Sequence, residues 1–293
     1  MSSDAVNGVL AGIGGVRGWQ EDLYRDLHRH PELSHHEERT AGAVADRLLA
    51  TGFTVHERVG GTGVIGVLVN GDGPRVLLRA DMDALPVKEA TGLPYASTVT
   101  ATDAGGAEVP VMHACGHDVH VSCLLGAAQL LADGARHWSG TLVALFQPAE
   151  ELGDGAQAMV EDGLADLVGA LDVALAQHVL ALPAGRLGTH SGPFLSASDS
   201  MRITVHGRGA HGSMPQAAVD PVVLAAMIVL RLQTIVSREL PPDDFAVLTV
   251  GSVRAGTKSN VIPEHAVIEL NIRSYSTQTR KAILGAIRRI VTA

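Results

Sequence analysis

One short stretch, Met112–Asp118 (MHACGHD), holds two imidazoles, a thiol and a carboxylate directly before an apolar run. That run, Val119–Ala132, predicts a helix over about 118–132. A strand-to-helix corner of this kind places several ligand-type side chains at one rim of a sheet. Zinc binds cysteine sulfur and histidine nitrogen readily, and manganese favours carboxylates and imidazole. We therefore interpret the stretch as the first part of a metal site.

Further ligand-type residues lie at the ends of later predicted strands. Phe146–Glu151 (FQPAEE) overlaps the end of the apolar strand Thr141–Gln147, and His178 lies near the end of the strand Asp172–Val179. Two free charges are costly beside a buried strand, so one glutamate needs a counter-ion while the other can act as a general base. Adjacent glutamates on an extended segment point to opposite sides, which allows one to bind metal while its neighbour faces substrate.

Each of these signals has an ordinary explanation when it is taken alone. A single cysteine is more often a small buried residue, a strand-end histidine is more often a hydrogen-bonded core residue, and paired glutamates are usually on the surface. Asp81 and Asp83 follow the predicted strand Arg75–Ala80, where either turn-capping acids or ligands are expected. The joint occurrence of these groups at the carboxyl ends of successive elements favours a functional site.

The N-terminal part of the chain predicts two helices. The first covers about 15–30 and ends at Pro31, and the second follows the capping-box pattern Ser34–Glu37 and runs to about Thr51. A cluster of histidines lies at their junction, which we interpret as a solvated surface rather than a metal site because no acid–histidine spacing repeats. Its members are His28, His30, His35 and His36.

The order of predicted elements indicates two domains. Strands and helices alternate up to Val179, which predicts an α/β domain with a largely parallel sheet covered on both faces. The composition changes near Gly192, and the later order β-α-β-β-α is that of an α+β sandwich that lacks one closing strand. We therefore expect a metal-binding domain over residues 1–191 and a second domain over residues 192–293.

Charge and hydropathy exclude several classes of partner. The net charge of −9 argues against a nucleic-acid partner. The longest apolar run, near Val222–Leu230, is too short for a membrane span, and the acid-bearing N-terminus does not have the basic region of a signal peptide. Cys115 and Cys123 are too far apart on one helix to form a disulfide, so a reduced, cytoplasmic location fits them better than a secreted one.

Six stretches of the chain, in this order, carry a family resemblance: Leu78–Glu89 (LRADMDALPVKE), His113–Asp118 (HACGHD), Phe146–Glu151 (FQPAEE), His178–Val179, Gly207–Pro215 (GRGAHGSMP) and Ser259–Glu264 (SNVIPE). Together they resemble the M20 metallopeptidase family. The resemblance is strongest to the amidohydrolase branch that includes N-acyl-amino-acid, hippurate and indole-acetyl-amino-acid hydrolases. It implies an α/β catalytic domain with an inserted ferredoxin-like lid through which the protein forms a homodimer.

The resemblance also implies roles for individual residues of the catalytic domain. Two divalent metal ions, manganese or zinc, would be bound by Cys115, His117, Glu151 and His178. Glu150 matches the general base and Asp81 matches the acid that orients a ligand. Arg79 stands where other members of the family have a ligand histidine, so a ligand role for this position is excluded.

Three residues of the lid match positions that act on substrate. His211 matches a residue that enters the site of the partner subunit and polarises the scissile carbonyl. Asn260 and Arg273 match residues that hold the substrate carboxylate. The expected substrate is thus a small N-acyl amino acid, whose amide bond would be cleaved by a metal-bridged water with Glu150 as the base.

The chain also departs from the family pattern. In the family, the catalytic domain resumes after the lid and supplies a further metal-binding histidine, whereas no histidine follows His265 here. We therefore expect that the 293-residue chain has one impaired metal site and turns over N-acyl amino acids weakly or not at all. The alternative is a non-catalytic, metal-binding or dimerising remnant. Glu150 favours the hydrolase, because a protein that only binds metal does not need a general base.

Overall fold

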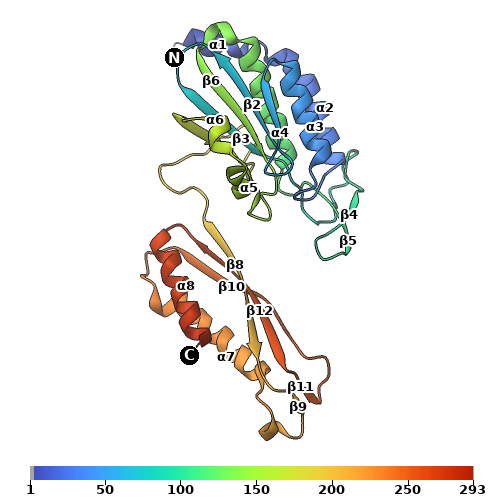
Figure 1. The fold of residues 1–293 in the computed structure, drawn as a ribbon, viewed down its shortest axis with the longest axis vertical. Coiled ribbons are helices and arrows are strands. Elements are labelled where there is room, and N and C mark those ends of the chain that lie inside the picture. The colour runs from blue at the N-terminus through green and yellow to red at the C-terminus, as the bar shows by residue number, and fades with distance from the viewer. Residues whose placement is uncertain (1–2, 293) are drawn as a thin grey trace. The chain divides into compact units, whose positions relative to one another are not determined.

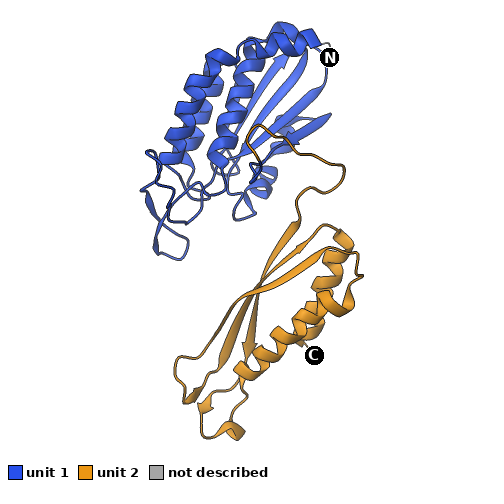
Figure 2. Ribbon diagram, turned by 180° about the vertical axis from the view of Figure 1, so that it is seen from behind, with its two compact units in different colours: residues 1–182 blue, residues 183–293 orange. Residues whose placement is uncertain are grey.

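A computed structural model describes residues 3–292 of the chain, which divides into two compact units, residues 1–182 and 183–293 (Figures 1 and 2). Each unit has its own buried hydrophobic cluster. The segment 183–196 contains no helix or strand, and the boundary expected after residue 191 lies within it. The first unit ends at residue 182, directly before this segment, because its last strand ends at Ala176.

The first unit contains helices on both sides of a central sheet. Its helices are α1 (Ser3–Leu10), α2 (Ile13–Arg29), α3 (Glu38–Ala50), α4 (His117–Asp133), the short η1 (Ala135–His137), α5 (Gly155–Glu161) and α6 (Leu164–Val168). Its strands are β1 (Thr54–Val59), β2 (Gly63–Asn70), β3 (Arg75–Asp81), β6 (Gly140–Gln147) and β7 (Val173–Ala176), with a separate hairpin of β4 (Thr100–Thr102) and β5 (Glu108–Pro110).

The five-stranded sheet has the order β1-β2-β6-β3-β7. Strand β3 is parallel to both β6 and β7, whereas β2 is antiparallel to β1 and to β6. Four strands therefore run in one direction and β2 alone runs against them, so the mostly parallel sheet predicted from the sequence is confirmed. Strand β2 is the exception because Gly60 and Gly61, both with positive φ, turn the chain directly from β1 into a hairpin.

Helices α2, α3 and α4 cover one face of this sheet, and α5 and α6 cover part of the other (Figure 1). On the first face, Leu48 of α3 and Leu125 of α4 are buried with Phe146 of β6. On the second face, Met159 of α5 packs with Val143 of β6. These layers fix the ends of β3, β6 and α4, from which the ligand-type side chains extend.

The start of α3 differs from the expected capping box. The Ser34 hydroxyl donates to Asp83 at 2.7 Å and does not cap the helix. The carboxylate of Glu32 caps it instead, because it accepts the backbone N–H groups of Arg39 and Thr40. Glu37 is fully buried and turns away from the helix end. The capping-box prediction was wrong because the side chains of Ser34 and Glu37 both form hydrogen bonds with distant segments.

The second unit is a three-stranded antiparallel sheet with two helices on one face (Figure 1). Its sheet order is β10-β12-β8, and Ile268 of β12 packs with Ile228 and Ile283 of the two helices. The order of its long elements is the expected β-α-β-β-α. In chain order the elements are β8 (Ala197–His206), β9 (Ala210–His211), η2 (Pro215–Ala217), α7 (Pro221–Thr234), η3 (Ile235–Glu239), β10 (Ala246–Ala255), β11 (Val261–Ile262), β12 (His265–Ser274) and α8 (Thr277–Thr292).

Helix α7 is longer than its apolar run. Asp220 caps its start, and the helix continues without a break through η3 to Glu239. By length and composition alone, Pro221–Glu239 could cross a membrane, so the sequence-based statement that no segment is long enough was wrong. Ala225, Ile228 and Leu232 pack against the sheet of the second unit, which accounts for much of its apolar character.

Candidate metal centre

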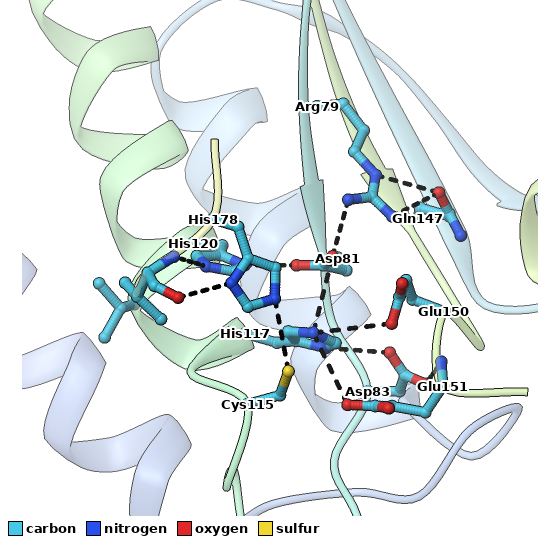
Figure 3. Close-up of polar contacts among 12 residues, drawn as sticks. Arg79, Asp81, Asp83, Cys115, His117, His120, Gln147, Glu150, Glu151 and His178 are labelled. Carbon is cyan, nitrogen blue, oxygen red and sulfur yellow. Dashed lines mark hydrogen bonds and ion pairs between the residues drawn. The ribbon is translucent and has the colours of Figure 1, made fainter. Parts of the chain in front are cut away.

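Ligand-type side chains from four elements meet at one edge of the first unit's sheet (Figure 3). Strands β3, β6 and β7 are parallel, so their carboxyl ends lie at the same edge. Asp81 ends β3, Glu150 and Glu151 follow β6, and His178 follows β7. His117 opens helix α4 beside them. The topology of the sheet therefore brings together residues that are up to about 100 positions apart in the chain.

The four residues expected to bind metal, together with Glu150, form two overlapping groups. The ligand atoms of Cys115, His117 and His178 all lie within 4.8 Å of one another, and so do those of His117, Glu150 and Glu151. Cys115 Sγ is 3.4 Å from His178 Nε2, and His117 Nε2 is 3.9 Å from Glu150 Oε2 and from Glu151 Oε1. His117 belongs to both groups and so links the thiol side of the centre to the carboxylate side.

Two atoms of this cluster are buried without a hydrogen-bond partner among the described residues, namely His117 Nε2 and Glu151 Oε1. Buried polar atoms nearly always have a hydrogen-bond partner, so two such atoms that lack one and lie 3.9 Å apart need a common explanation. A divalent cation would satisfy both, because imidazole nitrogen and carboxylate oxygen are ordinary ligands of zinc and manganese. The residues therefore fit a metal site.

Asp83 orients His117 toward this site. His117 Nδ1 donates to Asp83 Oδ1 at 3.1 Å, which leaves the lone pair of Nε2 directed at the glutamates. Carboxylates commonly orient metal-binding histidines in this way. Asp83 Oδ2 also accepts the Ser34 hydroxyl and the Glu151 backbone N–H. Burial acts to raise the pKa of Asp83, but these hydrogen bonds, led by that from His117, hold the pKa below its usual value.

Asp81, expected to be the orienting acid, holds a different histidine. It accepts hydrogen bonds from Arg79 Nη1 at 2.7 Å and from His120 Nδ1 at 2.5 Å, and its Oδ2 lies 3.6 Å from His117 Nε2. Burial acts to raise the pKa of Asp81, but the hydrogen bond from His120 and the charge of Arg79 hold the pKa far below its usual range. Arg79 also donates to Gln147 at the end of β6.

Sequence reasoning did not select Asp83 as the partner of His117, and it missed His120 altogether. His120 lies three residues after His117 on α4, and residues three apart share one face of a helix. That spacing was the available signal. Cys115 and Cys123 are both free, as expected.

A buried carboxylate also holds the turn that carries Glu150 and Glu151. Ala149 is fully buried and has φ +47°, a left-handed conformation that costs an alanine about 1–2 kcal/mol. Its N–H donates to Glu37 Oε1 at 2.8 Å, and the Thr62 hydroxyl donates to Glu37 Oε2 at 2.5 Å. Because Asp83 holds the N–H of Glu151, buried carboxylates fix the backbone on each side of Glu150.

The N-terminal histidine cluster is not a solvated junction throughout. His28 is buried, and its ring lies between Asp118 Oδ2 at 2.6 Å and Glu89 Oε1 at 3.1 Å. The hydrogen bond with Asp118 raises the pKa of His28 against the opposing effect of burial. His35 and His36 are exposed, as expected. The expectation of a solvated junction was wrong for His28, because the fold packs its face of α2 against α4.

The second unit places His211 and Asn260 side by side. Val261 pairs with His211 in the short β9–β11 ladder, and the Gly212 N–H donates to the Asn260 carbonyl at 2.8 Å. The Ser213 N–H donates to His211 Nδ1, so the neutral ring carries its hydrogen on Nε2. This side chain is exposed and can donate a hydrogen bond to a bound group.

Arg273 lies at the opposite end of the same unit. It is exposed near the end of β12, where Nε donates to Asn271 Oδ1, whereas His265 at the start of β12 lies near β11. Eight residues of antiparallel strand at about 3.4 Å each separate His265 from Arg273 by roughly 27 Å. Within one copy of the second unit, the structure therefore brings Asn260 to His211 but keeps Arg273 away from both.

Comparison with known proteins identifies the family. The family described as peptidase family M20/M25/M40 matches residues 77–291. A hippurate hydrolase of Campylobacter jejuni is 41% identical over 268 residues, which cover 91% of this chain and 67% of the relative. The chain belongs to peptidase family M20/M25/M40. An N-acetyl-L-cysteine deacetylase of Bacillus subtilis is 39% identical over 89% of the chain and 60% of its own length.

Solved structures agree with this assignment to the M20 family. A Staphylococcus aureus protein described as an aminohydrolase has 34% identity and a TM-score of 0.83, and the match covers 97% of this chain and 71% of that one. A dinuclear metal-binding M20 peptidase of Bacillus subtilis has 32% identity and a TM-score of 0.74, over 95% of this chain and 70% of that one. This chain thus spans 60–71% of the lengths of these four M20 relatives and neighbours.

Metal binding by this M20 chain is expected to depend on pH through Cys115. Burial, followed by the nearby Glu151 carboxylate, raises the pKa of the Cys115 thiol to about 12. The metal-free chain therefore holds the thiol proton at neutral pH, and a cation must displace it. Rising pH favours the thiolate, so the affinity should increase about tenfold per pH unit for each proton released.

Calorimetric titration with Zn²⁺ in two buffers of different ionisation enthalpy measures the number of protons released. A Cys115→Ala variant should release about one proton fewer than the unmodified chain. Cys123→Ala is the matched control and should release the same number as the unmodified chain. Equal proton release by the Cys115→Ala variant and the unmodified chain would show that the thiol does not bind the metal.

His113 is expected to make the fold sensitive to acid. Burial lowers the pKa of its ring to about 4, and neither ring nitrogen has a hydrogen-bond partner among the described residues. The unfolded chain therefore binds this proton more readily than the folded chain, and the free energy of unfolding falls as pH decreases from about 6.5 toward 4, by roughly 3 kcal/mol in total.

Urea unfolding of the metal-free chain across this pH range tests the expectation. A His113→Met variant should show a shallower loss of stability toward acid pH than the unmodified chain. His36→Met, which changes an exposed histidine, should retain the full pH dependence. If His113→Met and the unmodified chain lose stability in parallel, another group is responsible.

Proposed function

We propose that this M20 chain carries the metal centre of an amidohydrolase that cleaves the amide bond of N-acyl amino acids. The observation that carries the proposal is the pair of buried atoms, His117 Nε2 and Glu151 Oε1, that have no hydrogen-bond partner within residues 3–292, beside a second, more accessible glutamate. Two divalent ions, zinc or manganese, would be held by Cys115, His117, Glu151 and His178. When bound, such ions activate water and polarise a carbonyl oxygen.

Glu150 is the general base of this proposal. Its side chain is 39% exposed, whereas that of Glu151 is 19% exposed, so Glu150 is the glutamate that water and substrate reach more easily. Glu150 takes a proton from the water that adds to the amide carbon. It then gives that proton to the amine nitrogen as the C–N bond breaks, so the products are a carboxylic acid and a free amino acid.

Residues of the second unit would recognise the substrate. The Nε2–H of His211 can donate to the oxygen on which negative charge develops as water adds. The Arg273 guanidinium can pair with the free carboxylate of an amino acid. Both side chains are exposed. The proposed substrate class, an amide next to a carboxylate, follows from these two donors together with the base.

The proposal includes a homodimer. Arg273 and the His211–Asn260 pair lie at opposite ends of the second unit, too far apart for both to reach one small substrate, so two copies of the chain are needed. Helix α7 has an exposed apolar face suited to such contact, formed by Val222, Val223, Met227 and Leu230. A cytoplasmic location is also part of the proposal, since the Cys115 thiol must stay reduced to bind metal.

The test combines metal analysis with a substrate panel. The metal-free chain would be titrated with Zn²⁺ and with Mn²⁺, and then assayed on hippurate, N-acetyl amino acids and indole-acetyl amino acids by detection of the released amine. Metal-dependent amine release from any of these supports the proposal. Metal binding without release from any of them supports the alternative, a non-catalytic metal-binding protein. Failure to bind either ion overturns both.

A further inference from the structure

We infer that His120 is a positioning residue that fixes the backbone and the ring tautomer of His178. In this way it would set the distance between the His178 imidazole and the Cys115 thiol. The inference rests on the proposed function, since it takes His178 to be a metal ligand. It concerns a side chain that is not among the proposed ligands and that is 3% exposed.

The hydrogen bonds of His120 determine which of its nitrogens carries the hydrogen. The Val179 N–H donates to His120 Nε2 at 2.9 Å, so this nitrogen must present a lone pair. His120 Nδ1, 2.5 Å from Asp81 Oδ1, is then the N–H donor. Arg79 pairs with the other oxygen of Asp81 at 2.7 Å and so favours the ionised, accepting form of the carboxyl (Figure 3).

This arrangement removes His120 from the set of possible ligands. Asp81, His117 and His120 offer ligand atoms within 4.8 Å of one another, so spacing alone would allow a third metal group. Both ring nitrogens of His120 are already used, one as a donor to Asp81 and one as an acceptor from Val179. A metal at His120 would have to break one of these buried hydrogen bonds.

The accepted N–H belongs to the peptide group that joins His178 to Val179, so His120 fixes the plane of that peptide group. The His178 ring donates from Nδ1 to the Val179 carbonyl at 2.7 Å, which leaves the Nε2 lone pair facing Cys115 Sγ at 3.4 Å. The rings of His120 and His178 pack edge to face with centroids 4.7 Å apart. The direction of the His178 lone pair is therefore set by contacts that begin at Asp81.

A second contact holds the same segment from the other side. Gly116, between Cys115 and His117, has φ +82°, and a Cβ at this position would lie 2.4 Å from Val179 Cγ2. Val179 therefore packs directly on the backbone that carries Cys115. The His120 ring and the Gly116 backbone together hold Val179 in place.

The segment needs such support because regular structure does not provide it. Strand β7 ends at Ala176 and is exposed along its whole length, and residues 177–182 contain no helix or strand. His178 itself is only partly buried. A metal ligand on an irregular segment binds well only if neighbouring groups limit its motion, and changing such supporting groups commonly costs about 10–100-fold in metal affinity.

Two variants separate the two hydrogen bonds of His120. His120→Gln places an amide oxygen where Nε2 lies and can still accept the Val179 N–H. His120→Asn keeps an N–H that can donate to Asp81 but has no acceptor that reaches Val179. Both changes replace the buried ring with an amide side chain, so a purely structural role predicts similar losses for the two variants.

The experiment is a Co²⁺ titration of the metal-free chain, followed by the sulfur-to-cobalt charge-transfer absorption that reports metal bound to Cys115. His120→Asn should weaken Co²⁺ binding about 10–100-fold relative to His120→Gln and should alter this absorption band. Nitrogen-detected NMR of the metal-free chain should show the hydrogen of the His178 ring on Nδ1 in the unmodified chain and in His120→Gln. In His120→Asn it should show a mixture of tautomers.

The outcomes distinguish this inference from the proposed function. If the unmodified chain does not bind Co²⁺, the metal centre fails and the inference fails with it. If the unmodified chain binds Co²⁺ and the two variants bind it equally well, the metal centre stands and the role of His120 is overturned. Thermal unfolding of both metal-free variants checks that they are folded to the same extent.

Discussion

Replacing His117 is expected to reduce the affinity for divalent cations by more than about 100-fold, since changing only the outer partners of metal ligands already costs about 10–100-fold. His117 is fully buried and is the one residue shared by the thiol group and the glutamate group of ligands. Its Nε2 atom has no other partner among the described residues. Removing this nitrogen should therefore weaken both halves of the centre together.

Two variants make the test specific. His117→Ala removes the ring and also leaves Asp83 without its donor, so it is expected to lower stability as well as affinity. His117→Asn keeps an N–H for Asp83 and lacks only the distal nitrogen. Titration of metal-free protein with Zn²⁺ measures the affinity, with His36→Ala as a control at an exposed histidine. Retention of Zn²⁺ binding by a folded His117→Asn variant would contradict the assigned role.

Replacing Glu150 with glutamine is expected to lower turnover of an N-acyl amino acid by about 10²–10⁴-fold relative to the unmodified chain, the usual contribution of a general base. Glutamine has nearly the same shape but cannot take a proton. Because Glu150 is the more exposed of the two glutamates, metal binding should change little. The loss should therefore lie in kcat rather than in metal content.

Glu151→Gln is the matched comparison for this prediction. It alters the neighbouring, more buried glutamate, whose Oε1 lies 3.9 Å from His117 Nε2 and has no hydrogen-bond partner in the part of the chain that the structure describes. This variant should lose metal affinity first and turnover as a consequence. Parallel assays of amine release and bound metal on both variants measure the difference. If Glu150→Gln loses metal and Glu151→Gln keeps it, the roles of the two residues are exchanged.

The sequence predicted the elements of the fold well because periodicity is a local property. Helices α2, α3 and α4 begin and end close to their expected limits. The parallel order of β3, β6 and β7 followed from the alternation of strands and helices. Cys115, His117, Glu151 and His178 then come together because they follow elements whose ends meet at one edge of the sheet.

Hydrogen-bond partners could not be predicted in the same way. Asp81 and Asp83 are two residues apart and chemically identical, and only the packed structure shows that Asp83 holds His117 while Asp81 holds His120. Ser34 looked like a helix cap, but its partner is 49 positions away. His28 looked exposed, and it is buried by contacts with α4. Each of these errors concerns a contact between distant segments.

The bond between Glu37 and Ala149 bears on where an autonomous metal-binding fragment could begin. Every side chain proposed to contact the ions or the substrate lies within residues 77–291, the part of the chain that the family match covers. Glu37 and Thr62 lie outside that part, yet they hold the left-handed backbone that precedes the two glutamates. A polypeptide trimmed to the matched region would retain the chemical groups of the centre but would have to order that backbone without its anchor.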